Sequence, residues 1–196
     1  SDVSKASSLD ASDRKVLGSS MPTWYGGWNN TVSYKNFDLN VFFRFSGGNK
    51  IMNASRQSAL FNMDFSNNGT EILGRWVSPE QPGDGMTPKI GYGDASSLFK
   101  DGYTDSHFVE SGNYLKLSTL ALGYTLPKAV VSKLNMTKIR FYVQGQNLLT
   151  ITGYSGLDPQ VRTDDGSGNS KDRNMGTDYG SYGMPRQFIL GVNVTF

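Results

Sequence analysis

The chain of 196 residues contains no cysteine and a single histidine, His107. Without thiols it can form neither disulfides nor cysteine-ligated metal sites, and one histidine gives no cluster for metal binding or acid–base catalysis. No run of about 18 apolar residues is present, so a transmembrane helix is not predicted, and residues 1–5 do not resemble a signal peptide. The net charge of +2 indicates no polyanionic partner, so nucleic acid is not expected.

Glycine and aromatic side chains are abundant, at 23 residues and 12% of the chain. This combination is typical of strands that carry aromatic belts and need glycine at bends. Residues 186–196 alternate between apolar and polar or small side chains, with Ile189 as the exception. The pattern predicts a strand with one face against lipid and one against water, although a half-buried strand of a soluble protein alternates in the same way. Its apolar face carries Phe188, Leu190, Val192, Val194 and Phe196.

Residues 23–34 and 37–47 are predicted to form a hairpin, because Lys35-Asn36 between them suits a two-residue turn. If Tyr34 pairs with Phe37, one face of both strands becomes almost entirely apolar. Each strand has about ten residues, enough for a tilted strand to cross the hydrocarbon layer. The residues predicted to face lipid here are Trp28, Val32, Leu39, Val41, Phe43 and Phe45.

Two further strands are predicted at 113–126 and 138–150, with Leu122, Phe141 and Val143 facing lipid. Leu115 and Leu117 have the opposite parity to Leu122. This predicts either a β-bulge near Ser118-Thr119, or that the part of the strand with Leu115 and Leu117 stands above the bilayer. A helical turn is expected within 129–135, after Pro127 ends the strand.

The connections alternate between short and long. The links at Lys35-Asn36 and Pro127 are short, whereas 48–112 and 151–185 far exceed the roughly 12 to 15 residues usual for loops in compact soluble domains. Outer-membrane barrels show this asymmetry, with tight periplasmic turns and long extracellular loops. Residues 1–22 are then expected to end another external loop, and 23–196 to form a barrel segment.

Five strands leave two open edges, and inside lipid each unpaired backbone group costs several kcal/mol. Other strands must therefore complete the structure. The predicted fold class is all-β, an antiparallel transmembrane β-barrel, of which this chain supplies the last five strands.

Short motifs follow one another in a fixed order along residues 13–196. They are Asp13–Gly18, Tyr34–Leu39, Asn53 with Arg56, Arg75-Trp76 with Pro79, Asn113–Leu117, Leu122–Pro127, Gln146–Thr152, Gly156–Gln160 and Pro185-Arg186. Together they resemble the carboxy-terminal part of SusC/RagA-family TonB-linked outer-membrane transporters. Lys116 and Gln160 depart from that pattern, which usually has arginine and glutamate at these positions.

The resemblance implies a barrel of about 22 strands in the bacterial outer membrane, with a plug upstream of these residues. It also implies energy input from the TonB complex, a SusD-like surface lipoprotein as a lid, and an oligosaccharide or peptide substrate. Phe196 would be the terminal aromatic residue that the assembly machinery reads. No cofactor and no catalytic residue are predicted.

Two sets of side chains are candidates for contact with substrate. Loop aromatics could stack on sugars or pack against a lid protein, or could simply pack the loops themselves. Polar residues predicted to face the lumen could form a path for a hydrated substrate, or could serve lumen hydrogen bonding and contact with the plug. The loop aromatics are Trp76, Tyr92, Tyr103 and Tyr154, and the lumen residues are Arg44, Lys116, Arg140, Gln144 and Gln146.

Other features indicate structure rather than chemistry. Trp24, Trp28, Tyr34 and Tyr124 are typical of aromatics at the membrane interface. His107 is expected to be a solvated loop residue. The segment 164–172 is rich in oxygen ligands but lacks the spacing of an EF-hand loop, which favours a plain loop over a calcium site.

The sequence thus predicts part of a non-enzymatic nutrient importer. One alternative is a passive porin or surface-adhesion barrel. A second is a soluble carbohydrate-binding β-sandwich, in which the apolar stripes would pack against one another.

Overall fold

The computed structural model describes residues 15–60, 67–87, 89, 106–160 and 175–196. The chain divides into two compact units. Unit 1 comprises residues 1–21, 49–111 and 161–181, and unit 2 comprises 22–48, 112–160 and 182–196. All five predicted strands lie in unit 2, whereas unit 1 consists mostly of segments that were expected to be loops.

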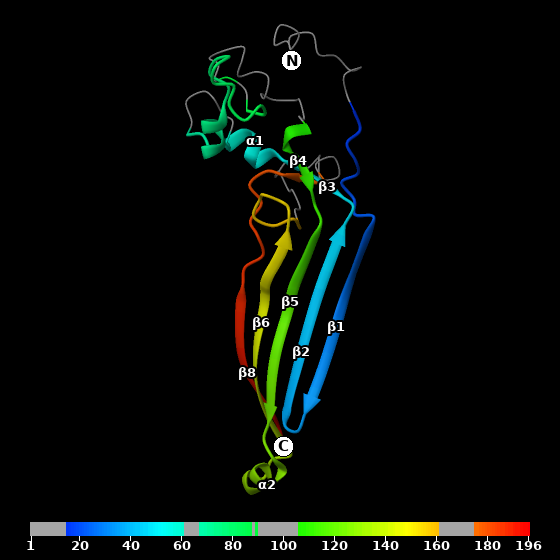
Figure 1. Cartoon of the computed structure of the whole chain (residues 1–196). Coiled ribbons are helices and arrows are strands. Elements are labelled where there is room, and N and C mark those ends of the chain that lie inside the picture. The colour runs from blue at the N-terminus through cyan, green and yellow to red at the C-terminus, as the bar shows by residue number, and fades with distance from the viewer. Residues whose placement is uncertain (1–14, 61–66, 88, 90–105, 161–174) are drawn as a thin grey trace, which may run out of the picture. The chain divides into compact units, whose positions relative to one another are not determined.

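Unit 2 is built on a five-stranded antiparallel sheet in the order β1-β2-β5-β6-β8 (Figure 1). The sequence predicted each of these strands, and the largest difference in bounds is at the end of β6, at Thr152 rather than residue 150. The strands are β1 (Trp24–Tyr34), β2 (Phe37–Gly47), β5 (Tyr114–Thr125), β6 (Lys138–Thr152) and β8 (Gln187–Thr195).

The β1–β2 hairpin has the predicted register. Tyr34 pairs with Phe37 and Trp28 pairs with Phe43, so each cross-strand pair lies on the expected face. The rings of Trp28 and Phe43 are stacked, with their centroids 5.7 Å apart. Lys35 closes the turn with a φ of 53°, a left-handed conformation that turns of two residues require.

The predicted β-bulge is present at Ser118. Phe42 faces Thr119 and Phe43 faces Leu117, so Ser118 has no partner on β2. Because one extra residue reverses the alternation, Leu117 returns to the apolar face beside Phe43. The bulge therefore explains the change of phase within this strand.

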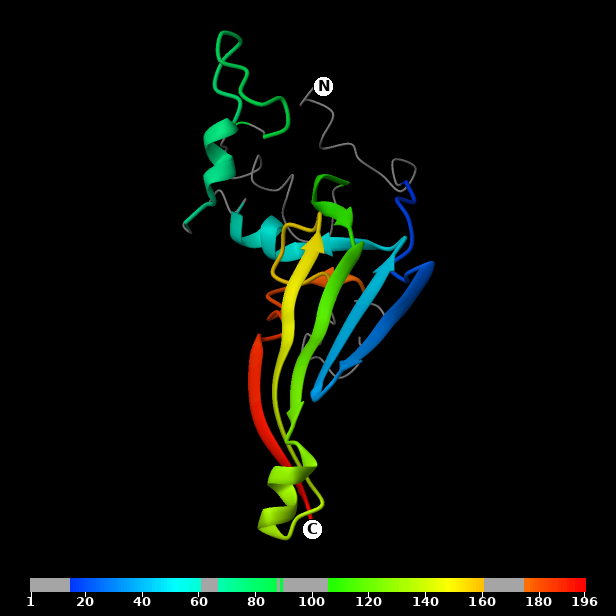
Figure 2. The same cartoon turned by 60° about the horizontal axis from the view of Figure 1, so that its bottom comes forward.

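The apolar face of the unit 2 sheet is continuous, and many of its side chains are exposed. Leu39, Leu122, Val143 and Leu190 are partners on four consecutive strands. Among the described residues of unit 2 no second layer packs over them (Figure 2), and Leu190 is 83% exposed. A soluble sandwich would bury such a face, so that alternative is wrong. The two outer strands, β1 and β8, are each paired on one side only among the described strands.

Unit 1 contains elements that the sequence did not predict. A three-stranded sheet has the order β4-β3-β7, in which β3 and β7 are parallel. These strands have two to four residues each, too few to leave an alternating pattern. The elements of unit 1 are β3 (Lys50–Asn53), α1 (Ala54–Leu60), η3 (Thr70–Gly74), η5 (Ser106–Phe108), β4 (Val109–Ser111) and β7 (Thr177–Asp178).

Two short helical segments join β5 to β6 in unit 2. They are α2 (Lys128–Val131) and η6 (Ser132–Leu134), at the place where a helical turn was expected. Nowhere in the described ranges is a helix long and apolar enough to cross a membrane.

Candidate functional site

The polar face of the unit 2 sheet is the candidate site. Thr31, Asn40, Ala121 and Gln144 are partners on four consecutive strands and lie on this face. The side chain of Asn40 donates hydrogen bonds of 2.8 Å to Asn29 Oδ1 and 2.9 Å to Thr31 Oγ1. These hydrogen bonds join the polar side chains of β1 and β2 on this face.

An ion pair crosses three strands of this face. Arg140 on β6 donates from Nε to Asp38 Oδ1 on β2 at 2.9 Å, and a second hydrogen bond joins the same two side chains. The pair passes over Gly123 of β5, where an added Cβ would lie 2.3 Å from the guanidinium and 2.5 Å from the carboxylate. Glycine at this position therefore makes room for the ion pair.

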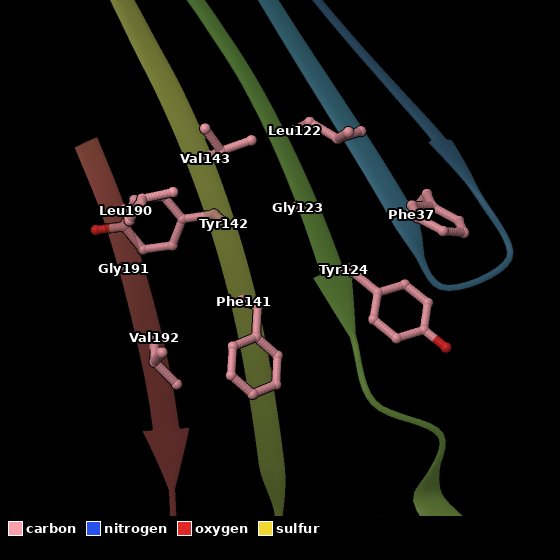
Figure 3. Close-up of a pocket in the computed structure, with 10 residues that line it drawn as sticks. All are labelled: Phe37, Leu122, Gly123, Tyr124, Phe141, Tyr142, Val143, Leu190, Gly191 and Val192. Atoms are coloured by element: carbon pink, nitrogen blue, oxygen red, sulfur yellow. The ribbon is translucent and has the colours of Figure 1, made fainter. Parts of the chain in front are cut away.

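Tyr142 extends the same layer toward β8. Its ring lies over Gly191, where an added Cβ would approach the ring to 2.3 Å (Figure 3). The Arg140 guanidinium is 5.2 Å from the centroid of this ring, within cation–π range. A hollow at these strands is lined mostly by side chains of the opposite, apolar face, among them Leu122, Val143 and Leu190. The ion pair and the Tyr142 ring thus hold neighbouring strands together.

Lys116 lies in a buried polar cluster and is only 1% exposed. Its Nζ donates to Asp158 Oδ2 at 2.9 Å and to Gln160 Oε1 at 2.7 Å. Gln160 in turn donates from Nε2 to the Tyr114 hydroxyl at 2.9 Å. Of the two roles expected for Lys116, these contacts show the structural one, hydrogen bonding within the wall. Lys116 and Gln160, the two residues that depart from the family motif, are therefore in direct contact.

Asp158 joins this cluster to two backbone segments. It accepts hydrogen bonds from the backbone N–H of Gln160 at 3.0 Å and of Met184 at 3.1 Å. Burial works to raise the pKa of Asp158, but the bonds from Lys116 and from these two N–H groups outweigh it and hold the pKa below its ordinary value. The stabilisation is therefore present above the ordinary carboxyl pKa and is lost as pH falls through the lower, folded value.

The structure places the predicted loop aromatics in different surroundings. Tyr154 is only 5% exposed and packs against Gly156, which is the loop-packing role that the sequence left open for it. Trp76 is 36% exposed, and Lys89 Nζ lies 5.8 Å from its ring. Tyr92 and Tyr103 lie outside the described residues.

The remaining predicted lumen residues lie on the polar face as expected. Arg44 is exposed and pairs with Lys116 across the β2–β5 ladder. Gln144 and Gln146 are half-buried and follow Arg140 along β6 at the same parity. Arg140 itself is engaged by Asp38. Lys116 and Arg140 are thus held in ion pairs, whereas no ion pair of Arg44 is found among the described residues.

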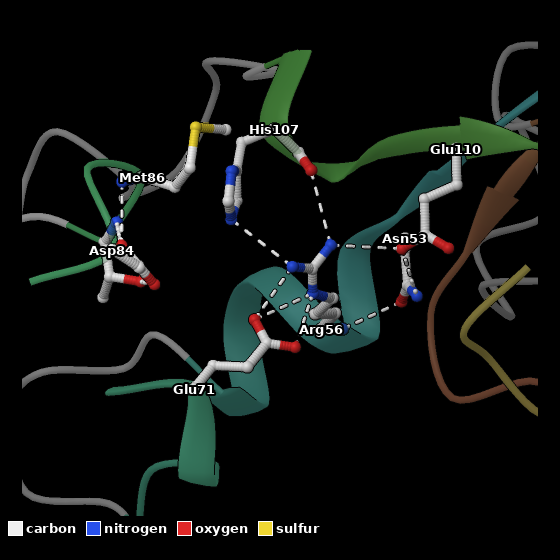
Figure 4. Close-up of polar contacts among 8 residues, drawn as sticks. Asn53, Arg56, Glu71, Asp84, Met86, His107 and Glu110 are labelled. Carbon is white, nitrogen blue, oxygen red and sulfur yellow. Dashed lines mark hydrogen bonds and ion pairs between the residues drawn. The ribbon is translucent and has the colours of Figure 1, made fainter. Parts of the chain in front are cut away.

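Unit 1 has a polar cluster of its own around Arg56 (Figure 4). The Arg56 guanidinium bonds both oxygens of Glu71, the shortest bond being 2.8 Å, and lies 3.3 Å from Glu110 Oε1. It also lies 5.6 Å from the ring centroid of the buried Phe108. Hydrogen bonding to Glu71 is the main cause that raises the pKa of Arg56. This arginine links α1, η3 and β4.

The motif of Asn53 followed by Arg56 has a local explanation. Asn53 Oδ1 accepts a hydrogen bond from the backbone N–H of Arg56 at 2.9 Å, which caps the first turn of α1. Its Nδ2 donates to Glu110 at 3.3 Å. The motif therefore starts the helix and orients its arginine.

His107 is half-buried and its backbone carbonyl accepts a hydrogen bond from Arg56, so the expectation of a solvated loop residue is wrong. Among the residues that the structure describes, no group of histidine and carboxylate side chains could hold a metal ion. The oxygen-rich segment 164–172 lies entirely outside the described residues, because 161–174 are not described.

The buried cluster predicts a strong effect of Lys116→Met. Removing the ammonium leaves Asp158 buried without its cation, which should lower the free energy of unfolding by about 3 kcal/mol. Adding Asp158→Asn removes the unpaired charge and should restore part of that loss. Urea unfolding of the complete barrel measures both variants, and strictly additive losses would contradict a direct interaction.

Gly123→Val should force Arg140 and Asp38 apart, because no space exists for the added side chain. We expect a loss of about 1–3 kcal/mol in unfolding free energy. Gly153→Ala is the matched control, since an added Cβ there meets no atom within 4 Å. Equal midpoints of thermal unfolding for wild type and Gly123→Val would show that the ion pair does not need this gap.

Comparisons with known proteins identify relatives over nearly the whole chain. The chain is 32% identical over 188 residues to TonB-dependent receptor P3 of Formosa agariphila, which covers 96% of this chain and 18% of the relative. It is 33% identical to TonB-dependent receptor P26 of the same organism, again over 96% of this chain and 18% of the relative. TonB-dependent receptor SusC of Bacteroides thetaiotaomicron is 23% identical, over 96% of this chain and 16% of that protein. No family model matches the chain.

The fold also matches solved structures. The RagAB peptide importer in its open-open state is 23% identical with a TM-score of 0.70, covering 93% of this chain and 18% of that chain. The RagAB peptide transporter is 24% identical with a TM-score of 0.73, covering 92% and 18% respectively. The chain spans less than a fifth of the length of these relatives. Sequence and fold together fit the carboxy-terminal part of the SusC/RagA family of TonB-dependent receptors.

Proposed function

We propose that these residues are barrel wall and extracellular rim of a TonB-dependent importer in the bacterial outer membrane. The observation that carries the proposal is the relationship to TonB-dependent receptors over 96% of the chain. The exposed apolar face and the two open sheet edges support it, because both require a bilayer and neighbouring strands. The role is non-enzymatic, and the plug and the segment that contacts the TonB complex belong to other parts of the protein.

The apolar face would contact lipid. Its side chains lie on one side of all five strands, and those of β8 are strongly exposed, Phe188 at 75%. Opposite to it, the polar face would line the lumen. Arg44, Gln144 and Gln146 are the groups there that could contact a passing substrate, whereas Lys116 and Arg140 fix the wall through their ion pairs.

The substrate would be a hydrated oligomer, an oligosaccharide or a peptide. A lumen surface of amide, hydroxyl and guanidinium groups can exchange hydrogen bonds with either class. The solved relatives include a peptide importer, RagAB. A SusD-like surface lipoprotein would act as the lid, and the exposed Trp76 of unit 1 is one aromatic side chain that could contact it or the substrate.

Active import predicts dependence on TonB. Cells that carry the complete protein should take up labelled oligosaccharides or labelled peptides when the TonB system is intact. Uptake of both probes should stop when TonB is deleted, because the plug then receives no energy input. A passive porin would keep its uptake in the deletion strain, and that result would overturn the proposal. Co-purification of a surface lipoprotein with the complete protein tests the lid.

The two faces of β8 should respond differently to charge. Leu190→Arg should cost about 2–4 kcal/mol if Leu190 lies near the middle of the bilayer, whereas Gln187→Arg on the polar face should cost much less. The amount of heat-modifiable, folded protein in outer membranes measures assembly of each variant. Equal assembly of the two arginine variants would mean that the faces are assigned wrongly. Deletion of Phe196 tests its role as the assembly signal in the same assay.

A further inference from the structure

The short connections of unit 2 carry three lysines without an acidic partner. Lys35 lies in the β1–β2 turn, and Lys128 and Lys133 lie in α2 and η6 between β5 and β6. Within the described ranges, none of the three forms an ion pair with a carboxylate. The turn and the β5 end adjoin, since the backbone N–H of Thr125 donates to the Asn36 carbonyl at 2.8 Å. We call Lys35, Lys128 and Lys133 the basic collar.

The acidic side chain nearest in sequence to the turn is already occupied. Asp38 is paired with Arg140 on the polar face. Lys138 has the same parity on β6 as Arg140 and so belongs to that face, not to the collar. Residues 127–138, which include the collar residues Lys128 and Lys133, contain no aspartate or glutamate. The positive charge of the collar is therefore available to an external anion.

Aromatic side chains of the apolar face surround the turn. Lys35 Nζ lies 5.4 Å from the centroid of the Tyr34 ring. Tyr34 pairs with Phe37, and the Phe37 and Tyr124 rings are 4.7 Å apart (Figure 3). Rings with a polar tip next to lysines are typical of the boundary between hydrocarbon and headgroups.

The helical segment also has the character of an interfacial element. Val131 is only 1% exposed and fixes α2, whereas Val130 is 46% and Leu134 is 53% exposed. These apolar side chains alternate with Lys128 and Lys133 in the sequence. Figure 1 shows α2 beyond the lower ends of β5 and β6, so it continues past the strands. Lysines with exposed apolar neighbours fit a layer of anionic headgroups over hydrocarbon.

We propose that the basic collar binds the phosphate groups of anionic phospholipids in the leaflet at the short-turn end of the barrel. This inference rests on the proposed membrane location. Each lysine supplies a point charge that attracts an anionic headgroup, and the aromatic side chains set the depth of the turns. The collar would thus anchor the wall against movement along the membrane normal.

Native mass spectrometry of the complete detergent-purified transporter tests the proposal, with phosphatidylglycerol and phosphatidylcholine of equal chain length as probes. Wild type should retain phosphatidylglycerol preferentially. The variant Lys35→Gln/Lys128→Gln/Lys133→Gln should lose that preference, by about fivefold for each lysine. The variant Lys35→Arg/Lys128→Arg/Lys133→Arg should keep it. Where the triple glutamine variant does not fold, Lys133→Gln alone should show the single-lysine loss.

A matched control has the same change in net charge. Lys15→Gln/Lys50→Gln/Lys89→Gln alters three lysines of unit 1 and should leave lipid retention unchanged. Equal retention of both lipids by wild type, or equal loss in this control, would overturn the proposal. Binding of wild type to isolated peptidoglycan in place of phosphatidylglycerol would also overturn it, in favour of the cell wall. Uptake is measured on the same variants. Absence of uptake in wild type would count against the importer, whereas uptake without a lipid preference would count against the collar alone.

Discussion

Backbone hydrogen bonding at the two sheet edges is the constraint on which this structure depends. β1 and β8 are each paired on one side among the described strands, and the apolar face between them is exposed. In hydrocarbon each unpaired backbone group costs several kcal/mol, so the sheet is stable there only when further strands continue it. The relatives are much longer than this chain, so they contain residues that can supply the neighbouring strands.

The polar face serves two structural purposes at different places. Toward the short turns, Asp38 and Arg140 join strands that are not neighbours, and Gly123 gives them room. Toward the long connections, Lys116 and Asp158 fix a loop segment and the backbone before β8. Both ion pairs use charges that would otherwise line an open lumen. The wall is therefore held by its own charged residues, and amide side chains with Arg44 form the remaining polar surface.

The sequence was sufficient for the strands and their faces, because alternation and a two-residue turn determine these locally. It gave a bulge near Ser118-Thr119 as one of two explanations, and the register decides for the bulge. Contacts between distant strands were not predictable in this way. Arg140 was assigned to the polar face, but the β2–β5–β6 register is needed to place it and Asp38 on either side of Gly123. The unit 1 sheet was missed because its strands are too short to show a period. The contact between Lys116 and Gln160 did leave a signal, since both depart from the family motif.

Accessibility along β8 is the most direct measurement of the central claim. The chain has no cysteine, so single cysteines can be introduced at each position from 187 to 195 and labelled in the complete protein in membranes. We expect a period of two. Fluorescent labels at positions 188, 190, 192 and 194 should be quenched by a lipid-soluble reagent, and cysteines at 187, 191 and 193 should react with an aqueous reagent. Uniform aqueous labelling of both sets would contradict a wall that separates lipid from water.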